Sequence, residues 1–520
     1  MTRTTEDDSS TRADNTAETA GVVSRRAFFT AGLGGATWLG AGSAATAQDV
    51  APGGNPFALR PFDKVYLLVN RITQGFTQRD YRRAKQMGYE AYLEEQLDYL
   101  NINDTAMDNR LAPYTTLGMS NAELIANYPP DGPNPYQPAG ELIEANLLRS
   151  IFSKRQLHQR MVEFWTDHLN TFILDGPLIY FKTVEDREVI RQHALGNFGD
   201  LLRASARGAA MLYYLDNYAN ITGAPQENYG RELMELHSMG ILNGQQPFTE
   251  TDVVEVARCL TGWTIDGSAQ NFGDFVYYPP FHDNGPKTVL GVSIPAGGGE
   301  SDGDTVLDIL INRPETATYI AYKMARWLLA YEPPARIVER TAAEYTRTGG
   351  DIKAMIRIIL AQKSMTITGQ KSLPKLRRPY HFIIALLRAT RAQVISSTFL
   401  FSYLDQMGNV PYLWPAPDGY PDALDDWGSG LLPRWGFAAA LLGNQVPGVT
   451  VNLNQFFAQV GGIKPQLLVH QINKILADGN LAPQDMAHVQ GFLDSQPFLT
   501  GTVILEAIAL AASSPSYQFY

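Results

Sequence analysis

Hydrophobic residues recur at helical spacing along most of the chain. In the segment 63–100 they mark one helix after Asp63 and a second helix after Gly88. The same spacing continues through 141–168 and 198–214. Residues three and four positions apart share one face of a helix, so these segments are expected to form amphipathic helices that pack against one another.

Two further helices are delimited by residues that start or stop helices. A helix over 227–239 is expected to end at Gly240, because glycine readily adopts the left-handed conformation that closes many helices. The next helix runs through Leu260, with Thr249 or Thr251 as its N-cap. The sequence therefore predicts both helix boundaries.

Irregular segments separate the predicted helices. Residues 127–140 are rich in Pro, Gly and Asn and predict a long surface loop. Residues 272–304 favour a loop with one short hairpin near 288–294, and helical spacing resumes over 304–330. A segment rich in Pro, Trp and Gly covers 407–433.

Together these patterns predict a mainly α fold. We expect one large multi-helix domain over residues 62–520, with long irregular loops and at most a small β-hairpin. A helical C-terminal subdomain is expected to begin near residue 375. No long low-complexity linker divides this region, and it contains no internal repeat.

Composition is that of an ordinary globular protein: 45% of the 520 residues are hydrophobic and 18% are charged. The formal net charge is −11 and no basic cluster is present, so nucleic acid is not expected as a partner. The single cysteine, Cys259, can form neither an internal disulfide nor a thiolate metal cage. It lies in an apolar stretch and is expected to be a small buried hydrophobic residue.

The N-terminus has the pattern of a twin-arginine signal peptide over residues 1–47. Ser24-Arg25-Arg26-Ala27-Phe28-Phe29 precedes a weakly hydrophobic run, which ends at the cleavage pattern Ala45-Thr46-Ala47. The run is too short and too rich in glycine for a membrane span, so we expect no stable span after cleavage. Residues 48–61 are expected to be a flexible N-terminal segment, and the mature protein to be periplasmic or extracellular. This route carries proteins that are already folded, so a cofactor can be inserted before export. The sequence identifies no particular cofactor, but a divalent metal is compatible with this route.

Several separated motifs follow one another in order. They are Glu163-Phe164-Trp165-Thr166-Asp167-His168; Arg187 with His193-Ala194-Leu195-Gly196-Asn197-Phe198; Glu227 to His237; Ala257-Arg258-Cys259-Leu260-Thr261-Gly262-Trp263; His282-Asp283 with Lys287; and Gly419-Tyr420-Pro421. Together they resemble the domain-of-unknown-function family 1800, from about Phe62 to the C-terminus.

The resemblance implies a secreted, largely helical protein but supplies no reaction. Members of the family are often encoded beside a sulfatase-like secreted family, which makes a co-exported sulfatase-like protein one expected partner. The sequence departs from the family pattern at Cys259, where alanine is typical, and at Asp167, where asparagine is common.

The segment 227–239 carries the densest set of ionisable residues. Glu232 and Glu235 share one helix face, whereas His237 lies about 200° around the helix from Glu235. His237 can therefore join the carboxylates only if the helix tightens or unwinds just before Gly240.

The remaining chemistry rests on carboxylates and imidazoles, because the chain has no Gly-x-Ser-x-Gly, His-Glu-x-x-His, Walker or Cys-x-x-Cys motif. The candidate catalytic residues are Glu232, Glu235, His237, His282 and Asp283; the candidate metal ligands are His168, His193, His237 and His282; and the candidate binding residues are Arg187, Arg231, Lys287 and Trp263. Mixed nitrogen and oxygen ligands would suit zinc, manganese or iron.

Two hypotheses about function remain open. The first is an exported enzyme, dependent on a metal or on a carboxylate/histidine pair, that acts on an extracytoplasmic polymer or glycan. The second is a non-enzymatic scaffold or binding partner whose polar motifs are structural ion pairs. Convergence of the candidate residues on one pocket would favour the enzyme, and their separation would favour the scaffold.

Overall fold

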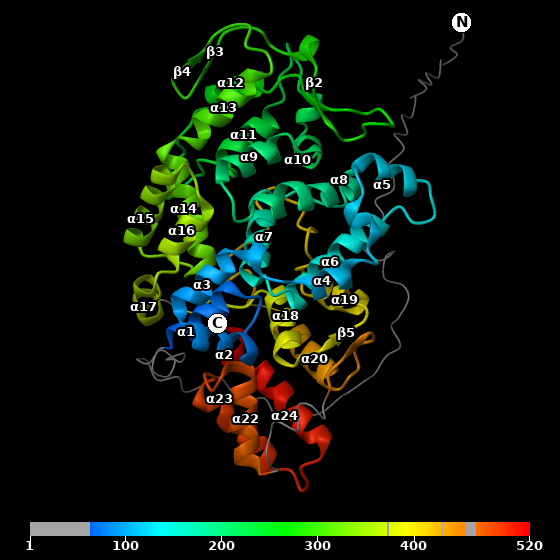
Figure 1. Cartoon of the computed structure of the whole chain (residues 1–520), viewed down its shortest axis with the longest axis vertical. Coiled ribbons are helices and arrows are strands. Elements are labelled where there is room, and N and C mark those ends of the chain that lie inside the picture. The colour runs from blue at the N-terminus through cyan, green and yellow to red at the C-terminus, as the bar shows by residue number, and fades with distance from the viewer. Residues whose placement is uncertain (1–62, 372–373, 429, 453–463) are drawn as a thin grey trace, which may run out of the picture. The chain divides into compact units, whose positions relative to one another are not determined.

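The fold is mainly helical, as the sequence pattern predicts, and is described here from a computed structural model (Figure 1). The structure describes residues 63–371, 374–428, 430–452 and 464–520, all of which belong to one compact unit, Gly54–Tyr520. The predicted signal peptide (1–47) and flexible segment (48–61) lie outside the described residues.

The first half of the unit is a series of helices of one to four turns. They are α1 (Lys64–Ile72), α2 (Gln78–Met87), α3 (Tyr89–Leu97), α4 (Thr105–Leu111), α5 (Asn121–Asn127), α6 (Gln137–Phe152), α7 (Gln156–His168), α8 (Leu178–Val184), the π-helix η3 (Glu185–Arg191), α9 (Phe198–Ala206), α10 (Ala209–Tyr214), α11 (Glu227–Glu235) and α12 (Glu250–Cys259).

The second half continues the series. Its helices are α13 (Ser301–Ile311), α14 (Pro314–Leu328), α15 (Ala335–Thr348), α16 (Ile352–Ile359), α17 (Gln362–Lys371), α18 (Pro379–Ala389), α19 (Thr398–Gln406), α20 (Leu431–Leu442), α22 (Pro465–Ala477), α23 (Pro483–Asp494), α24 (Gly501–Ser513) and α25 (Pro515–Gln518). Figure 1 shows α14, α15 and α16 packed side by side, and α22, α23 and α24 forming another group.

Strands are few and short in the described part of the chain. The predicted hairpin near 288–294 is confirmed as β3 (Lys287–Val289) paired with β4 (Val292–Ile294). Two antiparallel pairs were not predicted: β1 (Trp263–Ile265) with β2 (Phe275–Tyr277), and β5 (Gln393–Val394) with β6 (Val449–Thr450). Each strand has two or three residues, too few for hydrophobic alternation to reveal.

The predicted helix over 141–168 is two helices, α6 and α7. The break lies at Ser153, where the Ser153 hydroxyl donates to Asp104 Oδ2 (2.5 Å) and the Lys154 backbone NH donates to Asp104 Oδ1 (3.1 Å). The Asp104 carboxylate, which is distant in sequence, thus accepts hydrogen bonds from one side-chain donor and one backbone donor at the break. Similarly, Gly208 divides the predicted helix over 198–214 into α9 and α10.

Of the two predicted boundaries near the third motif, the structure confirms the Thr249 cap and contradicts the helix end at Gly240. Gly240 has φ +70° and its backbone NH donates to Met234 O (3.0 Å), a left-handed closing turn. Helix α11 nevertheless ends at Glu235, before the predicted end, so the chain unwinds ahead of His237. Thr249, rather than Thr251, caps α12 in a capping box with Asp252.

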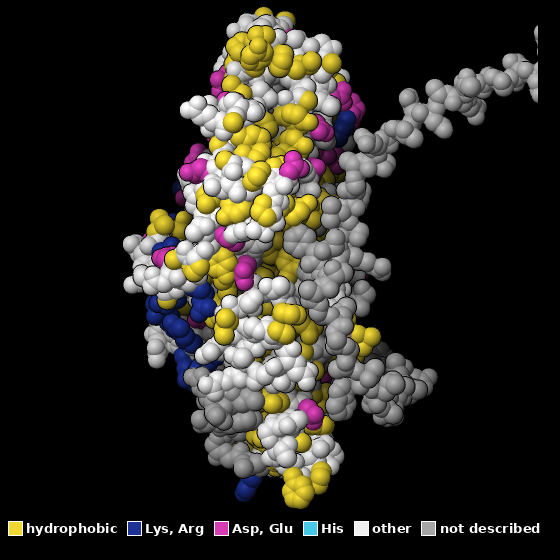
Figure 2. Space-filling view, turned by 90° about the vertical axis from the view of Figure 1, so that its right-hand side faces the viewer, with side chains coloured by type: hydrophobic (Ala, Val, Ile, Leu, Met, Phe, Trp, Pro, Cys, Tyr) yellow, Lys and Arg dark blue, Asp and Glu magenta, His cyan; other side chains and the backbone are white. Residues whose placement is uncertain are grey.

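One connected cluster of buried hydrophobic residues runs through most of the helices, and a small second cluster consists of Leu376, Tyr420 and Trp427. Cys259 is fully buried in the large cluster, and burial raises the pKa of its thiol to about 12. On the face in Figure 2, Lys and Arg gather in one small group at the left edge, and acidic side chains are scattered. Within the described residues, no helix combines the length and apolar character required to cross a membrane.

Candidate functional site

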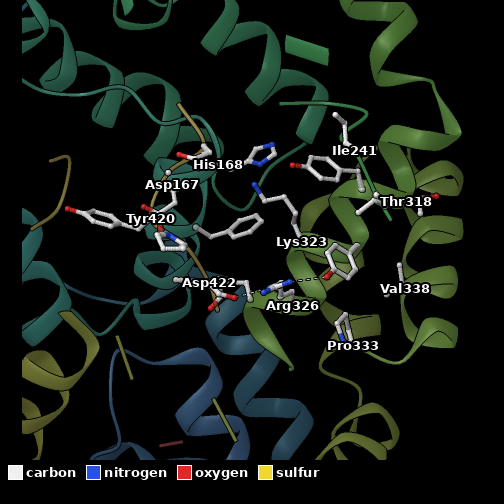
Figure 3. A pocket seen from close by; sticks show the side chains of 18 of the residues that line it. Asp167, His168, Ile241, Thr318, Lys323, Arg326, Pro333, Val338, Tyr420 and Asp422 are labelled. Carbon is white, nitrogen blue, oxygen red and sulfur yellow. Dashed lines mark hydrogen bonds between the residues drawn. The ribbon is translucent and has the colours of Figure 1, made fainter. Parts of the chain in front are cut away.

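A cavity of about 690 Å³ lies between the C-terminal end of α7, one face of α14 and the irregular segment after α19 (Figure 3). Its walls carry four acidic groups, three cationic groups, a histidine and several aromatic rings: Asp167, Glu339, Asp418, Asp422, Lys323, Arg326, Arg378, His168, Phe164, Tyr319, Tyr322, Trp327 and Tyr420. A concave site with convergent ionisable groups is the usual form of a small-molecule site.

The end of α7 supplies the acidic side of the cavity. Glu163 and Asp167 are four residues apart and therefore lie on the same face of the helix. The backbone NH of Leu169 donates to Trp165 O, which ends the helix and leaves Asp167 and His168 at its last turn. Both side chains are in the sequence motif that begins at Glu163.

The segment 418–422 is held directly against this helix end by a glycine. Gly419 has φ +73°, and a Cβ at this position would lie 2.0 Å from the backbone oxygen of Asp167. Only glycine permits that approach without displacing backbone. It places Tyr420 and Asp422 on the cavity wall (Figure 3).

Asp167 is held by a buried arginine. Arg378 Nη1 donates to Asp167 Oδ2 (2.6 Å), and the Arg378 guanidinium lies 4.6 Å from the Trp327 ring. Burial raises the pKa of Asp167 to about 6, with a contribution from Glu163 and against the opposing effect of Arg378. This carboxyl can therefore exchange a proton near neutral pH.

Lys323 extends from α14 toward His168 and Asp167 (Figure 3). Burial lowers the pKa of its amine to about 8, against the attraction of Asp167, Asp418 and Asp422. The cavity therefore contains a carboxyl and an amine whose pKa values lie on either side of neutrality. Perturbed ionisable groups in a cleft are a recognised mark of functional sites.

A buried ionic network lies beneath the cavity. Glu163 Oε1 is 2.7 Å from His381 Nε2, and Asp422 Oδ2 is 2.6 Å from Lys375 Nζ. Burial alone would raise the pKa of Glu163, but His381 and Arg160 lower it to about 2. Glu163 is therefore a fixed negative charge that positions neighbouring groups.

His168 and His237 are the only two of the candidate histidines that the structure brings together among its described residues. Their ring centroids are 6.3 Å apart, and His168 Nε2 donates to the backbone oxygen of His237 (3.1 Å). Burial lowers the pKa of His168 well below its usual value and that of His237 to about 3, so both are neutral. Nδ1 of His168 and both ring nitrogens of His237 have no partner within the described residues.

Glu232 and Glu235 lie on the half-buried face of α11 and do not line the cavity. Burial raises the pKa of Glu232, with a contribution from Glu235, as expected of carboxylates on one helix face. His237 follows the end of α11 and turns toward His168. The end of α11 before Gly240 therefore does not bring His237 into a contact with the two carboxylates.

His282, Asp283 and Lys287 belong to a separate polar network beside α12. His282 Nε2 is 3.2 Å from Asp302 Oδ2, and Lys287 Nζ donates to the same oxygen (2.7 Å). Asp283 forms an ion pair with Arg258 (2.7 Å), which holds its pKa at about 2. These buried and half-buried contacts have the form of structural ion pairs.

The other candidates also lie apart from the cavity. Arg187 donates to the backbone oxygens of Leu117 and Met119, and Arg231 forms an ion pair with Glu250. Trp263 is buried beneath the guanidinium of Arg207. His193 lines a second cavity of about 410 Å³, to which Arg207 also contributes.

The candidate catalytic residues therefore do not converge on one pocket, and the proposed four-histidine metal site does not form among the described residues. No group of three or more His, Cys, Asp or Glu side chains in the described segments has an arrangement that could hold a metal ion. The physical reason is that His193 and His282 have separate surroundings, whereas His168 and His237 pack together with a backbone contact between them.

Sequence reasoning missed the residues from α14 and gave only partial signals for the others. Asp167 and His168 lie in a motif, and Glu163 with Asp167 has the spacing of a helix face. Gly419 was also in a motif. Lys323 and Arg326 lie on a plain amphipathic helix, and nothing in their local sequence distinguishes them from ordinary surface cations.

These features define a class of helical protein in which one helix end, one helix face and a C-terminal loop form a polar cavity. The chain belongs to the family described as "Protein of unknown function (DUF1800)", which matches residues 67–519 and confirms the resemblance seen in the sequence. Neither the curated proteins nor the solved structures contain a match to this chain.

We predict that Arg378→Met destabilises the fold, because Asp167 loses its buried counter-charge. Breaking such a pair costs about 3–5 kcal/mol. The free energy of unfolding from denaturant titration measures the loss. It should be smaller at about pH 5 than at about pH 8, because a protonated Asp167 needs no counter-charge.

Arg340→Met, at an exposed position on α15, is the matched control and should change stability by less than about 0.5 kcal/mol. Equal effects of the two substitutions would contradict a structural role for the Arg378 pair.

Proposed function

We propose that this protein is an exported enzyme that cleaves glycosidic bonds in an extracytoplasmic polymer, with the cavity beside α7 and α14 as its substrate site. The twin-arginine pattern supports export to the periplasm or beyond. Membership of the family supplies no reaction, so the chemical proposal depends on the cavity alone.

The observation that carries the proposal is the pair of ionisable groups with pKa values near neutrality in one cavity. Ionised Asp167, above about pH 6, can accept a proton from an attacking water and return it to the departing sugar oxygen, so that the glycosidic C–O bond breaks as the new C–O bond to water forms. Protonated Lys323, below about pH 8, supplies positive charge on the other side of the cavity.

The walls suit a sugar better than a wholly apolar ligand. Tyr319, Tyr322 and Tyr420 provide aromatic surface beside charged side chains. Sugars combine apolar ring faces with hydroxyl groups, so such a mixed lining matches both parts of the ligand.

The role of Asp167 is proposed for this chain and not for its whole family, because the resemblance places asparagine commonly at this position. The proposal does not depend on a metal, since the described residues gather no set of metal ligands. It also replaces the five candidate catalytic residues named from the sequence with Asp167 and Lys323.

The test is the release of new reducing ends from a panel of neutral and anionic polysaccharides, measured as a function of pH. We expect cleavage of at least one polymer, with activity highest between about pH 6 and about pH 8. Activity should fall below this range as Asp167 becomes protonated, and above it as Lys323 loses its charge. Absence of cleavage across the panel would contradict the proposal.

A non-catalytic binding protein is the second candidate function, and a specific observation favours it. The polar side chains of the other motifs are held in ion pairs, such as Asp283 with Arg258 and Arg231 with Glu250. The ligand would then be an extracytoplasmic polymer or a co-exported sulfatase-like protein. Saturable binding of a polymer without new reducing ends would favour this function over the enzyme.

A further inference from the structure

One face of α14 directs aromatic and cationic residues toward the cavity. Tyr319, Tyr322, Lys323 and Arg326 are spaced at three and four residues, so they lie along a single stripe of the helix. Lys323 and Arg326 are therefore neighbours that can contact one ligand group at the same time.

The ammonium group of Lys323 has no direct counter-ion among the described residues. Its Nζ makes neither a hydrogen bond nor an ion pair with any described residue, and it lies 5.5 Å from the centroid of the Tyr319 ring. Lys323 is half-buried at the cavity wall. An ammonium group that is partly removed from water is stabilised by a nearby anion. At this position a bound ligand would have to supply that anion.

Arg326 is fixed in place by neutral acceptors. Its Nε donates to the backbone oxygen of Asp422 (2.9 Å), and its Nη1 donates to the Tyr322 hydroxyl (3.0 Å). The Arg326 dashed lines in Figure 3 show these contacts. Neither acceptor carries a formal charge, so the guanidinium is oriented but retains its full positive charge.

The inner carboxylates already have cationic partners. Asp167 pairs with Arg378, and Asp422 pairs with Lys375. Asp418 and Glu339 line the cavity from exposed positions, where water and salt weaken their effect on Lys323. The cationic pair on α14 therefore interacts with these carboxylates only at a distance, and neither cation forms a direct ion pair with a described residue.

We propose that Lys323 and Arg326 bind an anionic substituent of the sugar substrate, a carboxylate or a phosphate or sulfate ester. This inference rests on the proposed function, because it names the substrate class for the same cavity. Arg326 presents a planar donor group and Lys323 a point charge, a combination suited to an anion with more than one oxygen.

The experiment titrates the full-length mature protein, with its lysines ¹³C-dimethylated, and follows the Lys323 signal by NMR. Lys323→Met assigns the signal by its disappearance. The probes are glucuronate, glucose phosphate, glucose sulfate and glucose, all at one ionic strength set with sodium chloride. Calorimetric titration of the unmodified protein with the same probes is the control for any effect of methylation on binding.

We expect at least one anionic sugar to shift the Lys323 signal and to bind at least about tenfold more tightly than glucose. The strongest of the anionic probes identifies the kind of substituent. Lys323→Met should remove this preference, whereas Lys464→Met, at the exposed N-cap of α22, which does not line the cavity, should retain it. Equal affinity for glucose and all anionic probes, or no shift of the Lys323 signal, would overturn the inference.

The polymer panel separates this inference from the proposed function. Cleavage of neutral and anionic polymers at equal rates would overturn the anion site while leaving the enzyme intact. Preferential binding of anionic sugars without cleavage of any polymer would support the anion site and contradict the enzyme.

Discussion

Asp167→Asn should lower the rate of polymer cleavage by about 10²- to 10⁴-fold while leaving the affinity for the polymer nearly unchanged. The reason is that an amide keeps the size of the carboxyl but cannot accept a proton at neutral pH, and general base catalysis contributes about this factor. The fall in activity below about pH 6 should also disappear from any residual turnover. Initial rates and binding titrations on the same preparation provide the measurement.

The control is Asp405→Asn, an exposed carboxylate at the end of α19 that does not line the cavity. It should retain full turnover. Thermal unfolding of both variants checks that each is folded. Full activity of Asp167→Asn would show that Asp167 is a structural partner of Arg378, a role compatible with the asparagine common in the family.

Gly419→Ala should destabilise the fold by about 2–4 kcal/mol and reduce cleavage and sugar binding by at least about tenfold. The added Cβ would lie 2.0 Å from the Asp167 backbone oxygen, and φ is +73°. The segment 418–422 must therefore move away from α7, which displaces Tyr420 and Asp422 from the cavity wall. Denaturant titration and binding measurements test both effects.

Gly408→Ala provides a matched control because Gly408 also has a positive φ (+69°), but a Cβ there meets no atom within 4 Å. It should show only the backbone strain, about 1 kcal/mol, and normal binding. The account of Gly419 would be wrong if the two variants lost equal stability and both bound sugar normally.

Much of the fold was predictable from the sequence because the residues that start, continue and end a helix lie in or next to that helix. Hydrophobic spacing and the Thr249 cap both depend on residues within one or two turns. The break at Ser153 was not predictable, since it depends on Asp104, which lies 49 residues away. The short β1 and β5 pairings likewise depend on partners elsewhere in the chain.

The site was less predictable for the same physical reason. The cavity joins α7, α14 and the segment 418–422, and its assembly depends on the contact of Gly419 with Asp167. Residues that belong to recognisable motifs, such as His282, are instead held by hydrogen bonds outside the cavity. Lys323 is distinctive because it lines the cavity without a hydrogen-bond or ion-pair partner in the described structure. A local sequence pattern cannot show this, because it depends on residues from other parts of the chain.

The most direct test of the central claim is a crystal structure of Asp167→Asn bound to an oligosaccharide from a polymer that the wild-type protein cleaves. The account predicts sugar density in the cavity between α7, α14 and residues 418–422, with an anionic group within hydrogen-bond distance of Lys323. Density at another surface, such as the second cavity lined by His193 and Arg207, would contradict it.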